Sequence, residues 1–117
     1  MIINLTKQLV ISTKYTIANT FISRFMGLIG RDSLSDGEAL ILQPCTSIHT
    51  YFMKFPIDCI FLDKNNYVIY IVYHLKPWKL SPILLNARTV IELPSHIHLK
   101  DQIDIGDKIV YKIESYT

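Results

Sequence analysis

Two apolar runs separated by a polar turn are the feature that most constrains the fold of this chain. Residues 57–62 are apolar apart from Asp58, and residues 67–74 are rich in aromatic and β-branched side chains. The intervening residues 63–66 (Asp-Lys-Asn-Asn) are typical of a hairpin turn, because asparagine tolerates positive φ. The sequence therefore predicts an antiparallel pair of strands near the middle of the chain.

Shorter β-prone runs flank this pair on both sides. They cover residues 2–5, 8–12, 39–43, 46–53, 87–93 and 108–114. Residues 75–85 contain two prolines and the only tryptophan, and we expect a long surface loop there. Residues 95–102 could hold one helical turn capped by Ser95. About seven or eight short strands at this spacing favour an antiparallel or mixed sheet curled into a barrel.

One segment has the periodicity of a helix instead. Between residues 19 and 29, apolar side chains recur at steps of three and four, which predicts a short amphipathic helix. Asn19 or Thr20 can cap its start, and Gly30 can end it in a left-handed conformation. The predicted fold class is thus β-rich α+β, with one short helix beside a small barrel-like sheet.

Size and charge restrict the classes of function. The 117 residues predict a single domain over residues 1–117. The net charge is +2, from 12 basic and 10 acidic residues, and the basic residues are scattered. This balance gives no electrostatic reason to expect a nucleic-acid partner.

The chain also lacks the sequence signals of membrane proteins. No apolar stretch reaches the roughly 18 residues that a membrane span needs. The first residues lack a cationic leader, a long apolar core and a cleavage site. We therefore expect a cytoplasmic protein without a membrane partner, and the sequence leaves the oligomeric state open.

Residues 45–61 contain several residue types that could take part in chemistry, including both cysteines and a histidine. Cys45, His49 and Met53 are spaced by four residues, which on a strand corresponds to roughly 13 Å between neighbours. Metal–ligand bonds measure about 2.0–2.3 Å, so two such neighbours cannot easily share one ion. We expect no metal site and no cofactor.

Cys45 and Cys59 are expected to be free thiols that pack like small apolar residues, and a disulfide between them is the less favoured alternative.

The same run contains the residue types of a thiol–imidazole–carboxylate set. Cys45, His49 and Asp58 are therefore the candidate catalytic residues, although strand spacing would separate Cys45 from His49.

Two carboxylates in apolar runs need partners. Asp58 and Glu92 both lie between apolar residues, and a buried carboxylate requires hydrogen bonds or a positive charge. Arg24 and Arg31 are candidate partners, because a guanidinium can bind a carboxylate through two hydrogen bonds. Such a polar network could be structural, or it could line a cleft that binds an anion or a sugar. Trp78, between Lys76 and Lys79, could form a ligand rim or a partner contact, or could close one end of the barrel.

Residues along most of the chain, from about Thr16 to Val110, resemble the domain of unknown function 192, a prokaryotic family without an established activity. The matching positions are Arg24, Gly27, Leu28, Arg31, Cys45, Ile48, His49, Thr50, Met53, Pro56, Asp58, Phe61, Val90, Ile91, Glu92, Leu93, Pro94, Gly106 and Asp107. The resemblance implies a compact β-rich, barrel-like domain whose short helix carries the Arg-x-x-Gly-Leu segment. The polar positions shared with the family are Arg24, Arg31, His49, Asp58 and Glu92.

Three hypotheses follow. The leading one is a non-enzymatic domain that binds a small polar ligand or a protein partner at Arg24, Arg31, His49, Asp58 and Glu92, with Trp78 at the rim. The second is a hydrolase or transferase that uses Cys45 or a His49–Asp58 pair, and a reactive, low-pKa Cys45 would favour it. The third is a structural or assembly domain with an exposed patch around Trp78.

Overall fold

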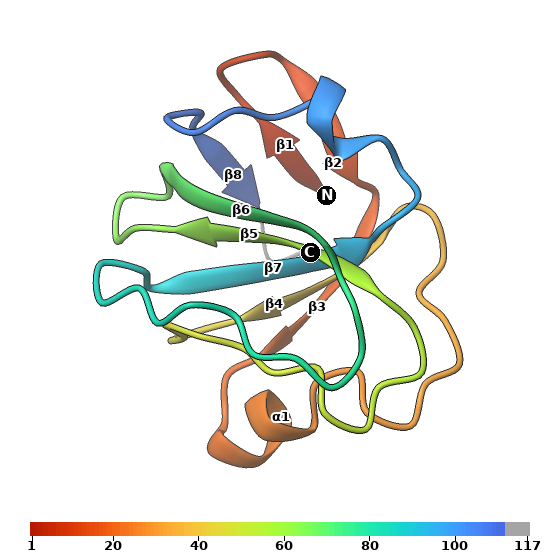
Figure 1. The fold of residues 1–117 in the computed structure, drawn as a ribbon. Helices are drawn as coiled ribbons and strands as arrows, with labels where there is room; N and C mark the ends of the chain where they lie inside the picture. The colour runs from red at the N-terminus through yellow and green to blue at the C-terminus, as the bar shows by residue number, and fades with distance from the viewer. Residues whose placement is uncertain (112–117) are drawn as a thin grey trace, which may run out of the picture.

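The computed structural model describes residues 1–111 and shows a strand-rich fold with one α-helix (Figure 1). The elements are β1 (Ile2–Asn4), β2 (Leu9–Ser12), β3 (Lys14–Ala18), α1 (Phe21–Met26), β4 (Glu38–Leu42), β5 (Ile57–Leu62), β6 (Val68–Leu75), β7 (Thr89–Pro94), the 3-10 helix η1 (Leu99–Asp101) and β8 (Ile109–Tyr111). The predicted β-rich α+β class is confirmed. Within residues 1–111, no helix is long and apolar enough to cross a membrane.

The predicted hairpin forms the centre of the larger sheet. β5 pairs antiparallel with β6 and, on its other side, with β7. All six residues of β5 and all six of β7 are buried, which explains their nearly continuous apolar sequences. β4 pairs antiparallel with β7 and parallel with β3, so the five-stranded sheet β3-β4-β7-β5-β6 is mixed.

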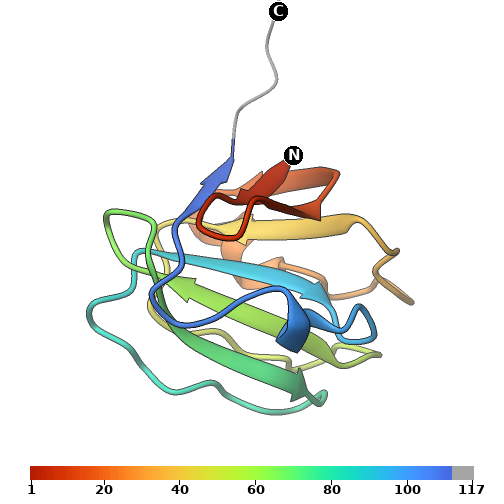
Figure 2. The same ribbon diagram turned by 90° about the horizontal axis from the view of Figure 1, so that it is seen from above.

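The sheets do not close into a barrel, and this corrects the expected curled single sheet. β1 pairs with β2 and β8 in a separate three-stranded sheet of order β2-β1-β8, and Figure 2 shows β1 beside β8. One isolated bridge, between Tyr67 and Lys108, joins the two sheets at a corner. The small sheet and α1 lie at opposite ends of the view in Figure 1, with the five-stranded sheet between them.

Two apolar clusters fill the two sides of the larger sheet. Ile60 of β5 belongs to the cluster shared with the small sheet, which includes Ile2 and Ile109. Its neighbours Cys59 and Phe61 belong to the second cluster, which includes Leu28 just after α1. Successive residues of β5 thus point to opposite sides, as the pleat of a strand requires.

The helix is shorter than predicted, and it contributes no side chain to the core. Thr20 caps it in a capping box with Ser23, and Gly27, with φ 46°, ends it before the predicted Gly30. None of its six residues is buried, and Leu28, two residues beyond its end, is buried instead. The apolar stripe of the sequence is therefore largely an exposed surface.

The predicted strand over residues 46–53 is wrong. This segment is irregular, and Thr50 at its centre bonds to the loop that follows β6. The Thr50 N–H donates to the Lys79 carbonyl at 2.9 Å, and the Trp78 N–H donates to the Thr50 carbonyl at 2.9 Å. The predicted loop at residues 75–85 is confirmed beyond Leu75, which ends β6. These two loops hydrogen-bond to each other rather than extending the sheet.

The two ends of the chain departed from the sequence prediction in smaller ways. The predicted runs at residues 2–5 and 8–12 form the antiparallel pair β1–β2, but β3 was not anticipated. The helical turn within residues 95–102 is η1, which follows His98 rather than a Ser95 cap. The predicted last strand begins at Ile109, and its residues 112–114 lie outside the described residues.

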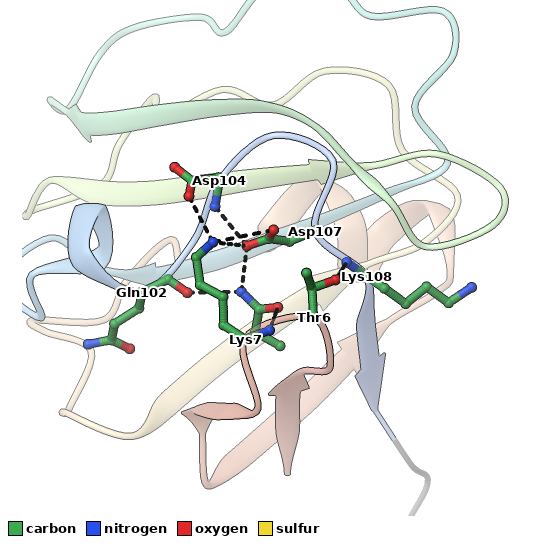
Figure 3. Close-up of polar contacts among 7 residues, drawn as sticks. Thr6, Lys7, Gln102, Asp104, Asp107 and Lys108 are labelled. Carbon is green, nitrogen blue, oxygen red and sulfur yellow. Dashed lines mark hydrogen bonds and ion pairs between the residues drawn. The ribbon is translucent and has the colours of Figure 1, made fainter.

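A cluster of hydrogen bonds and ion pairs connects the small sheet to the turn before β8 (Figure 3). Asn4, fully buried at the end of β1, donates a hydrogen bond of 2.8 Å to the Asp107 carboxylate. Lys7 contacts Asp107 at 3.1 Å and Asp104 at 2.7 Å, and the Asp104 N–H donates to Asp107 at 2.9 Å. Burial alone would raise the pKa of Asp107, but the hydrogen bonds outweigh it and hold the pKa below its ordinary value.

Candidate functional site

An open cavity of about 370 Å³ lies between α1 and the side of the five-stranded sheet that faces it. Its polar lining includes Arg24, Cys45, His49 and Glu92. Its apolar walls come from α1, from the end of β4 and from the residues that follow β4, namely Phe21, Phe25, Met26, Leu42, Ile48 and Met53. A volume of this size, with few polar groups in apolar walls, is typical of a small-molecule site.

Glu92 is the unusual residue of this cavity. It lies in the centre of the sheet on β7, opposite Leu40 of β4 and Cys59 of β5, and is only 2% exposed. Its Oε1 atom is wholly buried without a partner, and the Glu92 side chain forms no hydrogen bond or ion pair with any residue in 1–111. Burial raises the pKa of Glu92 to about 8, so the carboxyl group holds its proton at neutral pH.

Cys45 lies beside this carboxyl group as a half-buried thiol. Its Sγ atom contacts the Ser47 carbonyl at 3.1 Å. Burial raises the pKa of Cys45, and the nearby Glu92 adds to this effect, whereas the Arg24 charge opposes it. The thiol form is therefore favoured over the nucleophilic thiolate at neutral pH.

The thiol chemistry gives a first testable prediction. We expect iodoacetamide at pH 7.5 to alkylate Cys45 several times more slowly than free cysteine, because its thiolate fraction is reduced. Cys59, with no exposed surface, should react only after unfolding. Mass spectrometry of wild type and a Cys45→Ser variant assigns the label. Rapid modification of Cys45 at pH 6 would instead indicate an activated nucleophile.

Arg24 and His49 complete the polar lining of the cavity. Arg24 comes from the last turn of α1, and its Nη1 donates to the Asn19 carbonyl at 3.3 Å. The His49 Nδ1 accepts a hydrogen bond of 3.2 Å from the Tyr51 N–H. The His49 ring lies 5.3 Å from that of Phe25, so an α1 side chain packs against it.

Asp58 lies in a different cavity from His49. As the strand alternation requires, Asp58 points to the opposite side of the sheet from its neighbour Cys59. It lines a second cavity of about 330 Å³ with His74, His96 and residues of η1, and its Oδ1 accepts the His74 N–H at 2.7 Å. Burial raises the pKa of Asp58. The structure thus does not bring His49 and Asp58 together as a pair.

The predicted pairing of arginines with buried carboxylates is also not seen. Arg31 lies at the surface and forms an ion pair with Glu38 at 3.0 Å, and neither Asp58 nor Glu92 has an arginine partner in residues 1–111.

Trp78 is 58% exposed and contacts the rings of Phe52 and Tyr51 at 4.6 and 6.0 Å between centroids. Four predicted positions, Arg24, Cys45, His49 and Glu92, therefore share one cavity, while Asp58, Arg31 and Trp78 lie outside it.

Phe21, Phe25 and Met26 belong to the predicted apolar stripe of the helix, and in the structure they line the cavity. Gly27 and Gly30 were the sequence signal for a short helix. Glycine commonly ends a helix, so two glycines at these positions limit the helix to less than two turns.

Within residues 1–111, no three histidine, cysteine or acidic side chains gather in a way that could hold a metal ion.

Comparison with known proteins places the chain in a family. The model of the domain of unknown function 192, described as "Uncharacterized ACR, COG1430", matches residues 2–111. The chain belongs to this family. A UPF0127 protein of Pyrococcus horikoshii is 37% identical over 93% of this chain and 96% of its own length. A UPF0127 protein of Thermococcus sibiricus is 34% identical over 97% of this chain and 76% of its own length.

Two proteins with crystal structures share the fold of this chain. A protein of unknown function from Novosphingobium aromaticivorans superposes with a TM-score of 0.75 at 23% identity, covering 83% of this chain and 74% of that one. A putative transcription regulator from Sinorhizobium meliloti has a TM-score of 0.71 at 16% identity, covering 82% and 79%. At these identities the likeness concerns the fold alone, and the family has no assigned activity to transfer.

Proposed function

We propose that this protein is a binding domain for a small molecule, held in the cavity between α1 and the five-stranded sheet. The ligand has an apolar body and a polar end that hydrogen-bonds to Glu92. The single observation that supports the proposal is Glu92 itself, a fully buried carboxyl group that lines the cavity without a partner. A buried polar group without a hydrogen bond costs roughly 1–3 kcal/mol, a cost that a bound ligand would remove.

The residues that line the cavity indicate which chemical groups the ligand carries. Because Glu92 is protonated at neutral pH, its carboxyl group can donate a hydrogen bond to a carbonyl, ether or hydroxyl oxygen of the ligand. Arg24, which also lines the cavity, suits a second, anionic group. The aromatic and aliphatic walls suit an apolar body between the two. A cytoplasmic location remains part of this proposal.

A fragment screen with two Glu92 variants tests the proposal. Oxygen-containing fragments on an apolar body are screened against wild type by ligand-observed NMR, and hits are measured by titration. Glu92→Leu removes the donor and should weaken a hit by about tenfold or more. Glu92→Gln keeps an N–H donor and should retain much of the affinity.

The matched control is Glu38→Gln, the same chemical change at a surface carboxylate that pairs with Arg31. It should leave the affinity of every hit unchanged. Hits that bind Glu92→Leu as well as wild type would contradict the proposal. Hits whose binding is lost equally in Glu92→Leu and Glu92→Gln would identify the ligand as a cation and overturn the donor role of Glu92.

The rival function is a thiol-dependent enzyme. The observation in its favour is that Cys45 and His49 line the same cavity. The raised pKa of Cys45 argues against it, because an activated cysteine has a lowered pKa. The alkylation experiment above separates the two functions.

A further inference from the structure

The side of the molecule that carries α1 exposes an unusual number of large apolar side chains. In α1, the exposed fractions are 76% for Phe21, 72% for Ile22 and 55% for Phe25. In the loop after β6, they are 62% for Leu80, 71% for Ile83 and 85% for Leu85. We call these six residues, together with Phe52 and Trp78, the α1 face. Scattered exposed apolar residues are ordinary, but a contiguous group marks an interaction surface.

The α1 face is physically continuous. Aromatic rings run from Phe25 to His49 at 5.3 Å, on to Tyr51 at 5.2 Å and then to Trp78 at 6.0 Å between centroids. The Leu84 N–H donates to the Thr46 carbonyl at 2.9 Å, which joins the second loop to the first. Figure 1 shows α1 and the two loops on the same side of the five-stranded sheet, away from the small sheet.

The segments that form this face carry basic side chains but no acidic ones. Residues 19–31, 39–57 and 64–91, which supply α1 and both loops, contain no aspartate or glutamate. Lys76 and Lys79, which flank Trp78, are exposed and form no ion pair with the rest of residues 1–111. Lys54 is neutralised by Asp32 at 3.2 Å. A partner for this face is therefore anionic, and a second copy of the same face, with the same positive charges, is disfavoured.

We propose that the α1 face binds the surface of an anionic lipid bilayer. Tryptophan, phenylalanine and branched aliphatic side chains that protrude between lysines are the composition of interfacial membrane contacts. Side chains exposed by 70% or more, such as Leu85, can enter the boundary of the acyl chains, while Lys76 and Lys79 meet anionic headgroups. The expectation of no membrane partner rested on the absence of a long apolar run, which excludes a spanning segment but not a surface contact.

Vesicle binding with the single tryptophan as reporter tests this proposal. The intact protein is mixed with phosphatidylcholine vesicles with or without phosphatidylglycerol, and binding is measured by flotation and by the emission of Trp78. We expect binding and a blue shift with phosphatidylglycerol only, both weakened by added salt. Lys76→Gln and Lys79→Gln should each weaken binding by about fivefold. The double variant Ile83→Ser/Leu85→Ser should weaken it by about tenfold or more.

The controls are Ile105→Ser and Lys64→Gln. Ile105 is 65% exposed in the turn before β8, and Lys64 is exposed in the β5–β6 turn. Both should bind like wild type. Equal losses in the controls, or no binding to either vesicle, would overturn the proposal. Binding to polyglutamate but not to vesicles would also overturn it and assign the face to an acidic polypeptide.

Discussion

Replacing Glu92 with glutamine is expected to stabilise the protein at neutral and alkaline pH. The folded-state pKa of Glu92 is about 8, against an ordinary value of 4.5. Between these values the folded protein holds a proton that the unfolded chain has released, so the free energy of unfolding falls by roughly 1.4 kcal/mol per pH unit. The glutamine variant lacks this penalty and should gain on the order of 3 kcal/mol at pH 7. Urea unfolding from pH 4 to pH 8.5 measures the difference.

The stability advantage of Glu92→Gln over wild type should appear only as the pH rises. Below pH 4.5 both states of wild type carry the proton, so the variant should have no advantage there. Glu38→Gln is the matched control, because hydrogen bonding to the Ser35 N–H and the Arg31 charge lower the pKa of Glu38. That variant should lose a little stability above pH 4.5. An equal loss of stability in Glu92→Gln would show that the Glu92 carboxyl group has a stabilising partner.

Replacing Asp107 with alanine should have the largest destabilising effect. The change leaves Asn4 buried without its carboxylate acceptor and removes the contact of Lys7 with the turn before β8. We expect a loss on the order of 3 kcal/mol in the free energy of unfolding. The lowered pKa of Asp107 adds a pH dependence, because its stabilisation is present above the ordinary pKa of 3.8 and is lost as the pH falls below it.

Asp104→Ala is the control for this prediction. Asp104 also pairs with Lys7, but its side chain is 73% exposed, so its loss should cost less than about 1 kcal/mol. Similar losses in the two variants would contradict the role given to the buried bond between Asn4 and Asp107.

The parts of the fold that were predicted from the sequence depend on local patterns. The β5–β6 hairpin followed from two apolar runs and a turn rich in asparagine, and β7 from its β-branched and apolar residues. The strand wrongly assigned to residues 46–53 shows where such patterns fail. Thr50 has a high β propensity, yet its backbone pairs with Lys79 and Trp78 of a distant loop. Tertiary hydrogen bonds of this kind override propensity and leave no local signal.

The site was predicted only in part, because it depends on strand register. Asp58 and Glu92 look alike in sequence, each a single carboxylate in an apolar strand. In the sheet Glu92 lies opposite Cys59, while Asp58 lies opposite Leu93, so the two carboxylates point to opposite sides. A register differing by one residue would have placed them on the same side. The sequence alone does not contain that register.

Titration of the Glu92 carboxyl carbon by NMR tests the central claim most directly. With the carbon signal assigned by comparison with Glu92→Gln, we predict a single transition near pH 8 in the ligand-free protein, because burial without a partner disfavours the charged form. A transition at or below pH 4.5 would show a solvated or paired carboxylate. That result would contradict the account of Glu92 as the unsatisfied group at which the cavity binds its ligand.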